Sequence, residues 1–194
     1  MVLLVGMSGG SGAVYGVRLL EVLKQLKMEA HLIVSTAAKE TLAIETSHKL
    51  GYVESLASRV YRFNDITAPP ASGTFHTRGM VIIPCSMKTL AGVASGYSDN
   101  LLLRAAEVTL KERRPLVVVP RETPLTTIHI ENMLRVAQAG AIVLPAMPGF
   151  YGRPGTIDEL VDHIVGKVLD VLNIEHDLYR RWNGPQNDAR KVMK

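Results

Sequence analysis

Residues 2–16 read VLLVGMSGGSGAVYG, an apolar run that breaks into glycines and then continues in a helical pattern. The run at residues 2–5 predicts a short buried strand, and the spacing of Ala13, Val17 and Leu20 predicts a helix that packs one face on a sheet. The first N–H groups of a helix lack internal partners and carry the positive end of its dipole. We therefore predict an anion site, such as a phosphate site, where this helix begins.

The glycine pattern does not match a dinucleotide site. Counting from Gly10, the third glycine of such a site would fall on Tyr15, and Gly16 comes one place late. The next apolar run ends in Ser35, where a dinucleotide site usually has an acid for the ribose. FMN or a sugar phosphate fits better than NAD, and a tight turn without a ligand is the alternative.

Composition favours one globular α/β domain. The chain has 194 residues, of which 47% are hydrophobic and 21% charged, enough for one proper core. The net charge of +4 comes mostly from dispersed basic residues, so we expect small anionic ligands and no nucleic acid.

Cysteine and histidine usage argues against disulfides and metals. Cys85 is the single cysteine, and the six histidines show no metal-ligand spacing. Met1 leads directly into the first strand without a cleavable leader, and no apolar run reaches about 18 residues. We expect a cytoplasmic protein with no metal and no membrane span.

Strand-like and helix-like runs alternate along the chain, which predicts a parallel sheet with helices on both faces. The expected fold is three-layered and flavodoxin-like, or Rossmann-like, with ligands at the carboxyl ends of the strands. One FMN-binding domain is expected at residues 1–182, followed by a polar tail at 183–194. The strands are expected at 2–6, 30–35, 79–84, 116–120 and 141–145, and the helices at 12–27, 37–50, 86–95, 101–113, 128–139 and 157–172.

The loops that follow the strands carry the candidate functional residues. Ser86 is a plausible helix cap that opens a second anion-capable helix N-terminus, where Lys88 is either a ligand contact or a solvated lysine. Arg121 and Glu122 end another strand and point either to function or to pairing with the preceding helix. The loop at 147–155, MPGFYGRPG, is either a lid or a cover for the edge of the core.

Two charged features lie within helices. Arg104 and Lys111 fall on one helix face, which by itself describes an ordinary salt-bridged helix. Glu45 falls close to an apolar helix stripe, so its carboxylate needs either a partner or a raised pKa.

Six motifs in register resemble the flavin prenyltransferases of the UbiX type, formerly called phenylacrylic or polyprenyl-hydroxybenzoate decarboxylases. The resemblance covers roughly residues 2–182. The motifs are GGSGAVYG at 9–16, NDITAPPASG at 64–73, PCSMKTLAGVASG at 84–96, LKERRPLVVVPRETP at 110–124, IHIENM at 128–133 and LPAMPGFY at 144–151.

The resemblance implies a homododecamer of flavodoxin-like subunits with FMN at the subunit interfaces. It implies transfer of a dimethylallyl group from dimethylallyl phosphate to N5 and C6 of reduced FMN, without a metal. The product, prenylated FMN, would serve a UbiD-type aromatic acid decarboxylase.

The resemblance also assigns site residues. FMN contacts fall on Gly9, Gly10, Ser11, Ser35, Ser86, Met87, Lys88, Thr89 and Arg121. Prenyl-phosphate contacts fall on Tyr151 and Lys167, with Arg104, Lys111 and Ser72 nearby. The catalytic polar groups are Ser11, Glu45 and Glu122, and Lys111 supplies charge to the leaving phosphate.

Three positions depart from the family pattern. Lys167 stands where many members have Arg, and Ile66 where some have Trp, which leaves the monophosphate and the diphosphate open as donor. Gly10 replaces a more usual Ala and should be harmless. Two other functions stay open, an FMN-dependent decarboxylase acting directly on a small acid and a non-catalytic FMN-binding or delivery protein.

Overall fold

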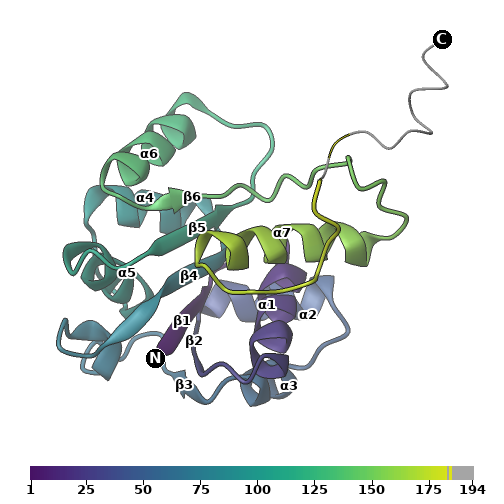
Figure 1. Cartoon of the computed structure of the whole chain (residues 1–194). Coiled ribbons are helices and arrows are strands. Elements are labelled where there is room, and N and C mark those ends of the chain that lie inside the picture. The colour runs from purple at the N-terminus through teal and green to yellow at the C-terminus, as the bar shows by residue number, and fades with distance from the viewer. Residues whose placement is uncertain (183, 185–194) are drawn as a thin grey trace, which may run out of the picture. The chain divides into compact units, whose positions relative to one another are not determined.

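The computed structural model describes residues 1–182 and 184 and divides into two compact units, Met1–Ala146 and Met147–Lys194 (Figure 1). The assignment of residues 1–182 to one domain stays a prediction. The predicted polar tail at 183–194 lies outside the described residues, apart from Gly184.

Helices lie between the successive strands of the described chain, two of them in succession after β2 and again after β4. None of the described helices is long and apolar enough to cross a membrane. The elements are β1 (Val2–Met7), α1 (Ala13–Gln25), β2 (Ala30–Val34), α2 (Thr36–Glu45), α3 (Leu50–Leu56), β3 (Arg59–Tyr61), a 3-10 turn (Pro69–Ala71), β4 (Thr77–Cys85), α4 (Met87–Ser95), α5 (Leu101–Lys111), β5 (Leu116–Pro120), α6 (Thr127–Gln138), β6 (Ile142–Val143) and α7 (Ile157–Val171).

In the part of the chain that the structure describes, six strands form one parallel sheet in the order β3-β2-β1-β4-β5-β6. Leu4 in the central strand β1 is paired with His31 of β2 on one side and with Met80 of β4 on the other. The chain leaves β1 toward β2 and later returns beside β1 as β4. This reversal is the topological switch point, at which parallel α/β sheets bind ligands.

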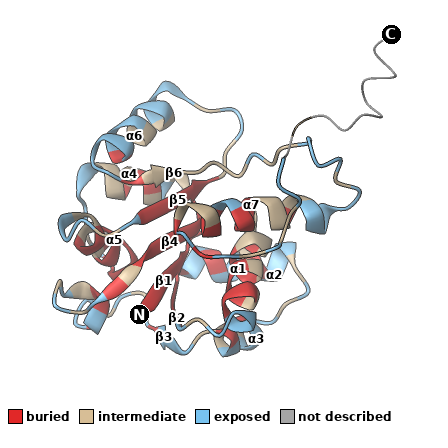
Figure 2. Cartoon of the chain, viewed as in Figure 1, coloured by how far each residue is buried: buried red, intermediate tan, exposed pale blue. Residues whose placement is uncertain are grey.

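The first unit has the predicted three layers. The strands β1, β2 and β5 are buried along their whole length, as expected for a sheet covered on both faces (Figure 2). Gly6 of β1 packs against Leu102 of α5, whereas Gly16 of α1 packs against Met7. Helices α1 and α5 therefore cover opposite faces, which confirms the flavodoxin-like α/β prediction.

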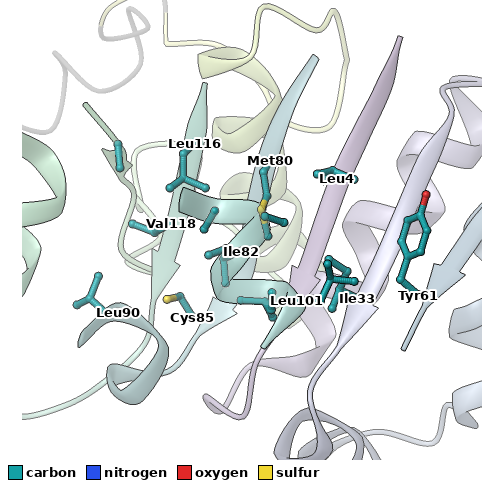
Figure 3. Packing of buried hydrophobic residues seen from close by; sticks show 14 of the residues in the cluster. Leu4, Ile33, Tyr61, Met80, Ile82, Cys85, Leu90, Leu101, Leu116 and Val118 are labelled. Atoms are coloured by element: carbon teal, nitrogen blue, oxygen red, sulfur yellow. The ribbon is translucent and has the colours of Figure 1, made fainter. Parts of the chain in front are cut away.

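The core on the α5 side is built from side chains that alternate along the strands. Leu4, Met80, Ile82 and Val118 belong to one buried cluster with Leu101 of α5 (Figure 3). Each of these side chains is almost completely removed from water. Burial of one such aliphatic side chain contributes about 1.5–3 kcal/mol, so the layer is fixed by apolar contact.

The predicted helix at 37–50 is wrong in its second half. Helix α2 ends at Glu45, because Thr46 takes an extended conformation and its hydroxyl donates to the carbonyl of Leu42 at 2.9 Å. A separate helix, α3, and the short edge strand β3 follow. Strand β3 was not predicted because two of its three residues are exposed, so it lacks a buried apolar run.

The second unit is held together around one carboxylate. Asp170 near the end of α7 accepts hydrogen bonds from Arg181 at 2.8 Å and from the Tyr179 hydroxyl, and it lies 3.1 Å from His176 Nε2. Burial opposes the charge, but these donors outweigh it and hold the pKa of Asp170 well below its usual range. The segment after α7 is therefore fastened back onto that helix.

Candidate active site

The carboxyl ends of β1 and β4 are joined by Ser8, a buried serine directly after β1. The Ser8 N–H and hydroxyl both donate to the carbonyl of Pro84, at 3.1 and 3.0 Å. The Ser8 Oγ in turn accepts from the N–H of Ser86 at 2.8 Å. Sequence reasoning missed Ser8, although its place directly after a buried strand was a usable signal.

The glycine turn after Ser8 has no place for a side chain at two positions and room for a methyl group at a third. A Cβ on Gly9 would lie 2.5 Å from the Cβ of Ala37 in α2, and Gly12 has a φ of 105°. A Cβ on Gly10 would lie 3.4 Å from Ser86 N, close to ordinary contact. The turn therefore requires glycine at 9 and 12, and the space beside Gly10 agrees with the expectation that alanine is tolerated there.

The amides at the start of α1 are bound by a carboxylate of the chain itself. Glu45, the last residue of α2, accepts from Gly12 N at 2.8 Å and from Ala13 N at 3.0 Å. The anion at this helix start is therefore Glu45 of the chain itself, and the predicted phosphate there stays a prediction. This carboxylate satisfies two of the four N–H groups that a helix leaves unpaired.

Glu45 has partners rather than a raised pKa. Partial burial opposes its charge, but the Ser11 hydroxyl, the two amides and the positive charge of Arg121 outweigh burial and lower the pKa of Glu45. Arg121 also donates from Nε to the carbonyl of Ser11 at 3.3 Å. Ser11, Glu45 and Arg121 thus form one cluster above the sheet.

Two further helices begin at the same edge, each capped by a serine. The Ser35 Oγ accepts from Ala38 N at 3.1 Å at the start of α2. The Ser86 Oγ accepts from Thr89 N at 3.3 Å and donates to the Thr89 hydroxyl at 3.1 Å at the start of α4. The predicted Ser86 cap is confirmed. Both caps are neutral side chains, so the positive ends of these helices keep their field.

The other candidate residues at this edge lie in the first turn of α4 and directly after β5. Met87 is half-buried and Lys88 is exposed in the first turn of α4. Glu122 turns its carboxylate to its own loop and accepts from Thr123 N at 3.0 Å. Tyr15, which sequence reasoning missed, feels the charge of Arg121, yet burial dominates and raises the pKa of its hydroxyl.

Ser72, Arg104 and Lys111 lie along a second cluster on α5 and the loop before β4. Arg104 donates from Nε to the carbonyl of Ala71 at 3.2 Å, and its guanidinium donates to Glu107 at 2.9 Å. A side chain on Gly73 would meet the Nζ of Lys111, which pairs with the neighbouring Glu112. The ordinary salt-bridged helix and the phosphate site are both compatible with this geometry.

Within one chain, Lys111 lies far from Ser11 and Glu45. Helix α5 runs from Leu102, which packs on Gly6 near the carboxyl end of β1, to Lys111 beside the loop before β4. At 1.5 Å per residue this is about 14 Å along the helix, toward the amino edge of the sheet. Lys111 therefore lies beside the loop before β4 and not at the strand ends.

Tyr151 and Lys167 belong to the second unit. Tyr151 is exposed, with its ring centroid 5.4 Å from that of Trp182. Both rings line a cavity of about 300 Å³ together with His163 and Tyr179. The Nζ of Lys167 lies 3.5 Å from the carboxylate of Asp170.

Comparison with known proteins places this geometry in a family. The family model Flavoprotein matches residues 1–169. The chain is 50% identical over 182 residues to the flavin prenyltransferase UbiX of Methanothermobacter thermautotrophicus, covering 94% of this chain and 95% of that protein.

Two solved structures are similar along nearly the whole chain. AnUbiX (PadA1) in complex with FMN and dimethylallyl pyrophosphate superposes with a TM-score of 0.94 at 45% identity, covering 95% of this chain and 98% of that one. A dodecameric FMN-dependent UbiX-like decarboxylase from Escherichia coli O157:H7 gives a TM-score of 0.93 at 49% identity, with coverage of 95% and 100%.

Proposed function

This chain belongs to the UbiX-type flavin prenyltransferases within the Flavoprotein family, and on that premise we propose that it transfers a dimethylallyl group from dimethylallyl phosphate to reduced FMN. The observation that carries the proposal is the cluster of Ser11, Glu45 and Arg121, set beside the serine-capped start of α4. Ser11 and Glu45 are groups that can hold a proton, and the α4 start with Arg121 can bind a phosphate ester.

The strand-end residues fit FMN. A phosphate monoester needs hydroxyl donors, free helix amides and positive charge, which Ser35, the residues 86–89 and Arg121 would supply. Reduced FMN, when bound, supplies the nucleophilic N5 and C6 atoms.

Ser11 and Glu45 would hold and move protons beside the flavin. Glu45 is anchored by the amides of α1 and stays ionised, so it orients the Ser11 hydroxyl. Glu122 at the end of β5 would take the proton that flavin C6 loses, either through Ser11 or through the departing phosphate.

The basic residues would stabilise the leaving phosphate. Cleavage of the allylic C–O bond leaves negative charge on phosphate, which Arg104, Lys111, Lys167 and the Tyr151 hydroxyl would neutralise. Since Lys111 lies beside the loop before β4 of its own chain, this part of the site would come from a neighbouring copy. A homododecamer, as in the Escherichia coli O157:H7 relative, would supply that copy.

The product points to a partner in the same compartment. Prenylated FMN would be handed to a UbiD-type decarboxylase that acts on aromatic acids. The single cysteine, Cys85, and the need for reduced FMN both suit a reducing compartment, so the cytoplasm is the proposed location.

The competing functions make different predictions. A decarboxylase of the related cysteine-decarboxylase group would be expected to carry Asn after residues 145–147, where this chain has Pro148. A storage protein would bind FMN without needing the ionised Glu45 beside Ser11.

The decisive experiment is anaerobic incubation of the purified protein with reduced FMN and dimethylallyl phosphate, followed by mass spectrometry of the extracted flavin. A gain of one C5H8 unit supports the proposal. Unchanged FMN calls for the diphosphate donor, in view of Ile66 and Lys167. Failure with both donors while FMN stays bound would favour storage or direct decarboxylation.

A further inference from the structure

Ser8 follows β1 directly and is hydrogen-bonded to Ser86, the residue that caps α4 after β4. Ser8 is 2% exposed, and its hydroxyl lies within hydrogen-bond distance of the Pro84 carbonyl and of the N–H and hydroxyl of Ser86. The hydroxyl proton goes to the Pro84 carbonyl at 3.0 Å, which leaves its lone pairs for the Ser86 N–H at 2.8 Å. Ser8 therefore ties the end of one strand to the first residue of the helix that follows the other.

Loss of this hydroxyl would fall almost entirely on Ser86. The Pro84 carbonyl also accepts from the Ser8 N–H at 3.1 Å, so it would keep a donor. The Ser86 N–H would lose the acceptor that holds the cap in its extended conformation, with φ −70° and ψ 155°. Leaving this partly buried amide without an acceptor is costly, so we expect the cap to reorient.

That cap is where the phosphate would bind. The Ser86 Oγ organises the Thr89 amide and hydroxyl at 3.3 and 3.1 Å, so its direction sets the whole first turn of α4. We propose that Ser8 is a positioning residue that aims Ser86 and Thr89 at the flavin phosphate. This inference rests on the proposed FMN site and adds a residue that does not touch the ligand.

The test compares two flavins that differ only in the phosphate. Flavin-free wild type and Ser8→Ala are titrated with FMN and with riboflavin by flavin fluorescence, without a prenyl donor. We expect Ser8→Ala to weaken FMN about tenfold and to leave riboflavin close to wild type, because one hydrogen-bonded element of the phosphate site is lost. A merely structural role would not separate the two flavins.

Thr109→Val is the matched control. The Thr109 hydroxyl is also buried and donates to the Ala105 carbonyl at 2.7 Å, but it lies near the far end of α5. This variant should lose thermal stability comparably while keeping the wild-type ratio of FMN to riboflavin affinity.

Unchanged FMN binding by Ser8→Ala, or equal weakening of both flavins, would overturn the proposal. If Ser8→Ala does not fold, Ser8→Cys, which keeps only a weak acceptor, is titrated in the same way and the same ratio decides. The ratio of FMN affinity to riboflavin affinity is measured without catalytic turnover. If the wild type binds FMN but forms no prenylated flavin, the proposed function is contradicted and the inference about Ser8 is not affected.

Discussion

Helices α1 and α4 begin at the same edge of the sheet, each after a strand and a short turn, yet their positive ends are used differently. The amides that open α1 bind the carboxylate of Glu45. The start of α4 is capped by the neutral hydroxyl of Ser86. The start of α1 therefore carries the negative charge of Glu45. The positive end of the α4 dipole is not neutralised by its cap and remains able to attract an anionic ligand.

The difference comes from where α2 ends. A carboxylate at the carboxyl end of a helix is unfavourable for its own helix, but Glu45 reaches the positive end of α1 instead. The glycine turn lets α2 come this close, since Ala37 packs directly on Gly9. A helix start is thus an anion site only if no carboxylate of the chain reaches it first.

The largest expected effect is the loss of kcat when the charge of Glu45 at the start of α1 is removed. Glu45→Gln keeps an acceptor for the α1 amides but removes the charge that orients Ser11, so we expect kcat to fall about 100-fold or more while FMN affinity stays near wild type. Steady-state formation of prenylated flavin and an FMN titration measure the two quantities. An unchanged kcat would show that the charge of Glu45 is not needed for the reaction.

A variant of Glu122, which follows β5, tests whether proton transfer needs a residue that belongs to neither the α1 start nor the α4 start. Glu122→Gln should retain FMN and stall before ring closure, with turnover reduced about 100-fold, because the amide cannot accept the C6 proton. Rapid-quench mass spectrometry with absorbance of the extracted flavin follows the reaction. Full turnover by this variant would remove Glu122 from the acid–base chemistry.

The close approach of α2 is tested by two neighbouring glycines. Gly9→Ala places a Cβ 2.5 Å from Ala37, so we expect a loss of about 1–3 kcal/mol in the free energy of unfolding. Gly10→Ala is the matched control and should unfold like wild type, since its Cβ has room. Chemical denaturation compares the two, and equal stability would show that α2 does not need to approach the turn.

The α4 start is tested by removing its cap. Ser86→Ala should weaken FMN about tenfold, because a hydroxyl donor and the ordered first turn are both lost. Stability should fall by about 1 kcal/mol, a usual cost of losing a helix cap. An FMN titration with a thermal melt measures both, and unaltered FMN affinity would contradict the assignment of the phosphate to this helix.

The smallest effect is the pH dependence of the α1 start. Because the pKa of Glu45 is lowered by folding, its charge stabilises the fold above the ordinary pKa and this stabilisation is lost as the pH falls through the lowered value. The difference in Tm between wild type and Glu45→Gln should be largest near neutral pH and shrink below about pH 4. A difference independent of pH would mean that the carboxylate is not stabilised in the fold.

Local patterns predicted the parts that depend on neighbouring residues. The buried runs of β1, β2 and β5 and the Ser86 cap could be read directly, because burial on both faces leaves continuous apolar strands and a cap acts three residues along the chain. The edge strand β3 and the end of α2 at Glu45 were not predicted, since neither is marked by a run of apolar residues.

The residues of the candidate site also divide into those that the sequence predicts and those that only the tertiary structure reveals. The sequence by itself determined which strands end in Ser35, Ser86 and Arg121, and parallel packing places such ends at one edge. Only the tertiary structure decided that Glu45 binds the first amides of α1 and that Ser8 accepts a hydrogen bond from Ser86. These pairs are 33 and 78 residues apart, and such contacts exist only after the helices pack on the sheet.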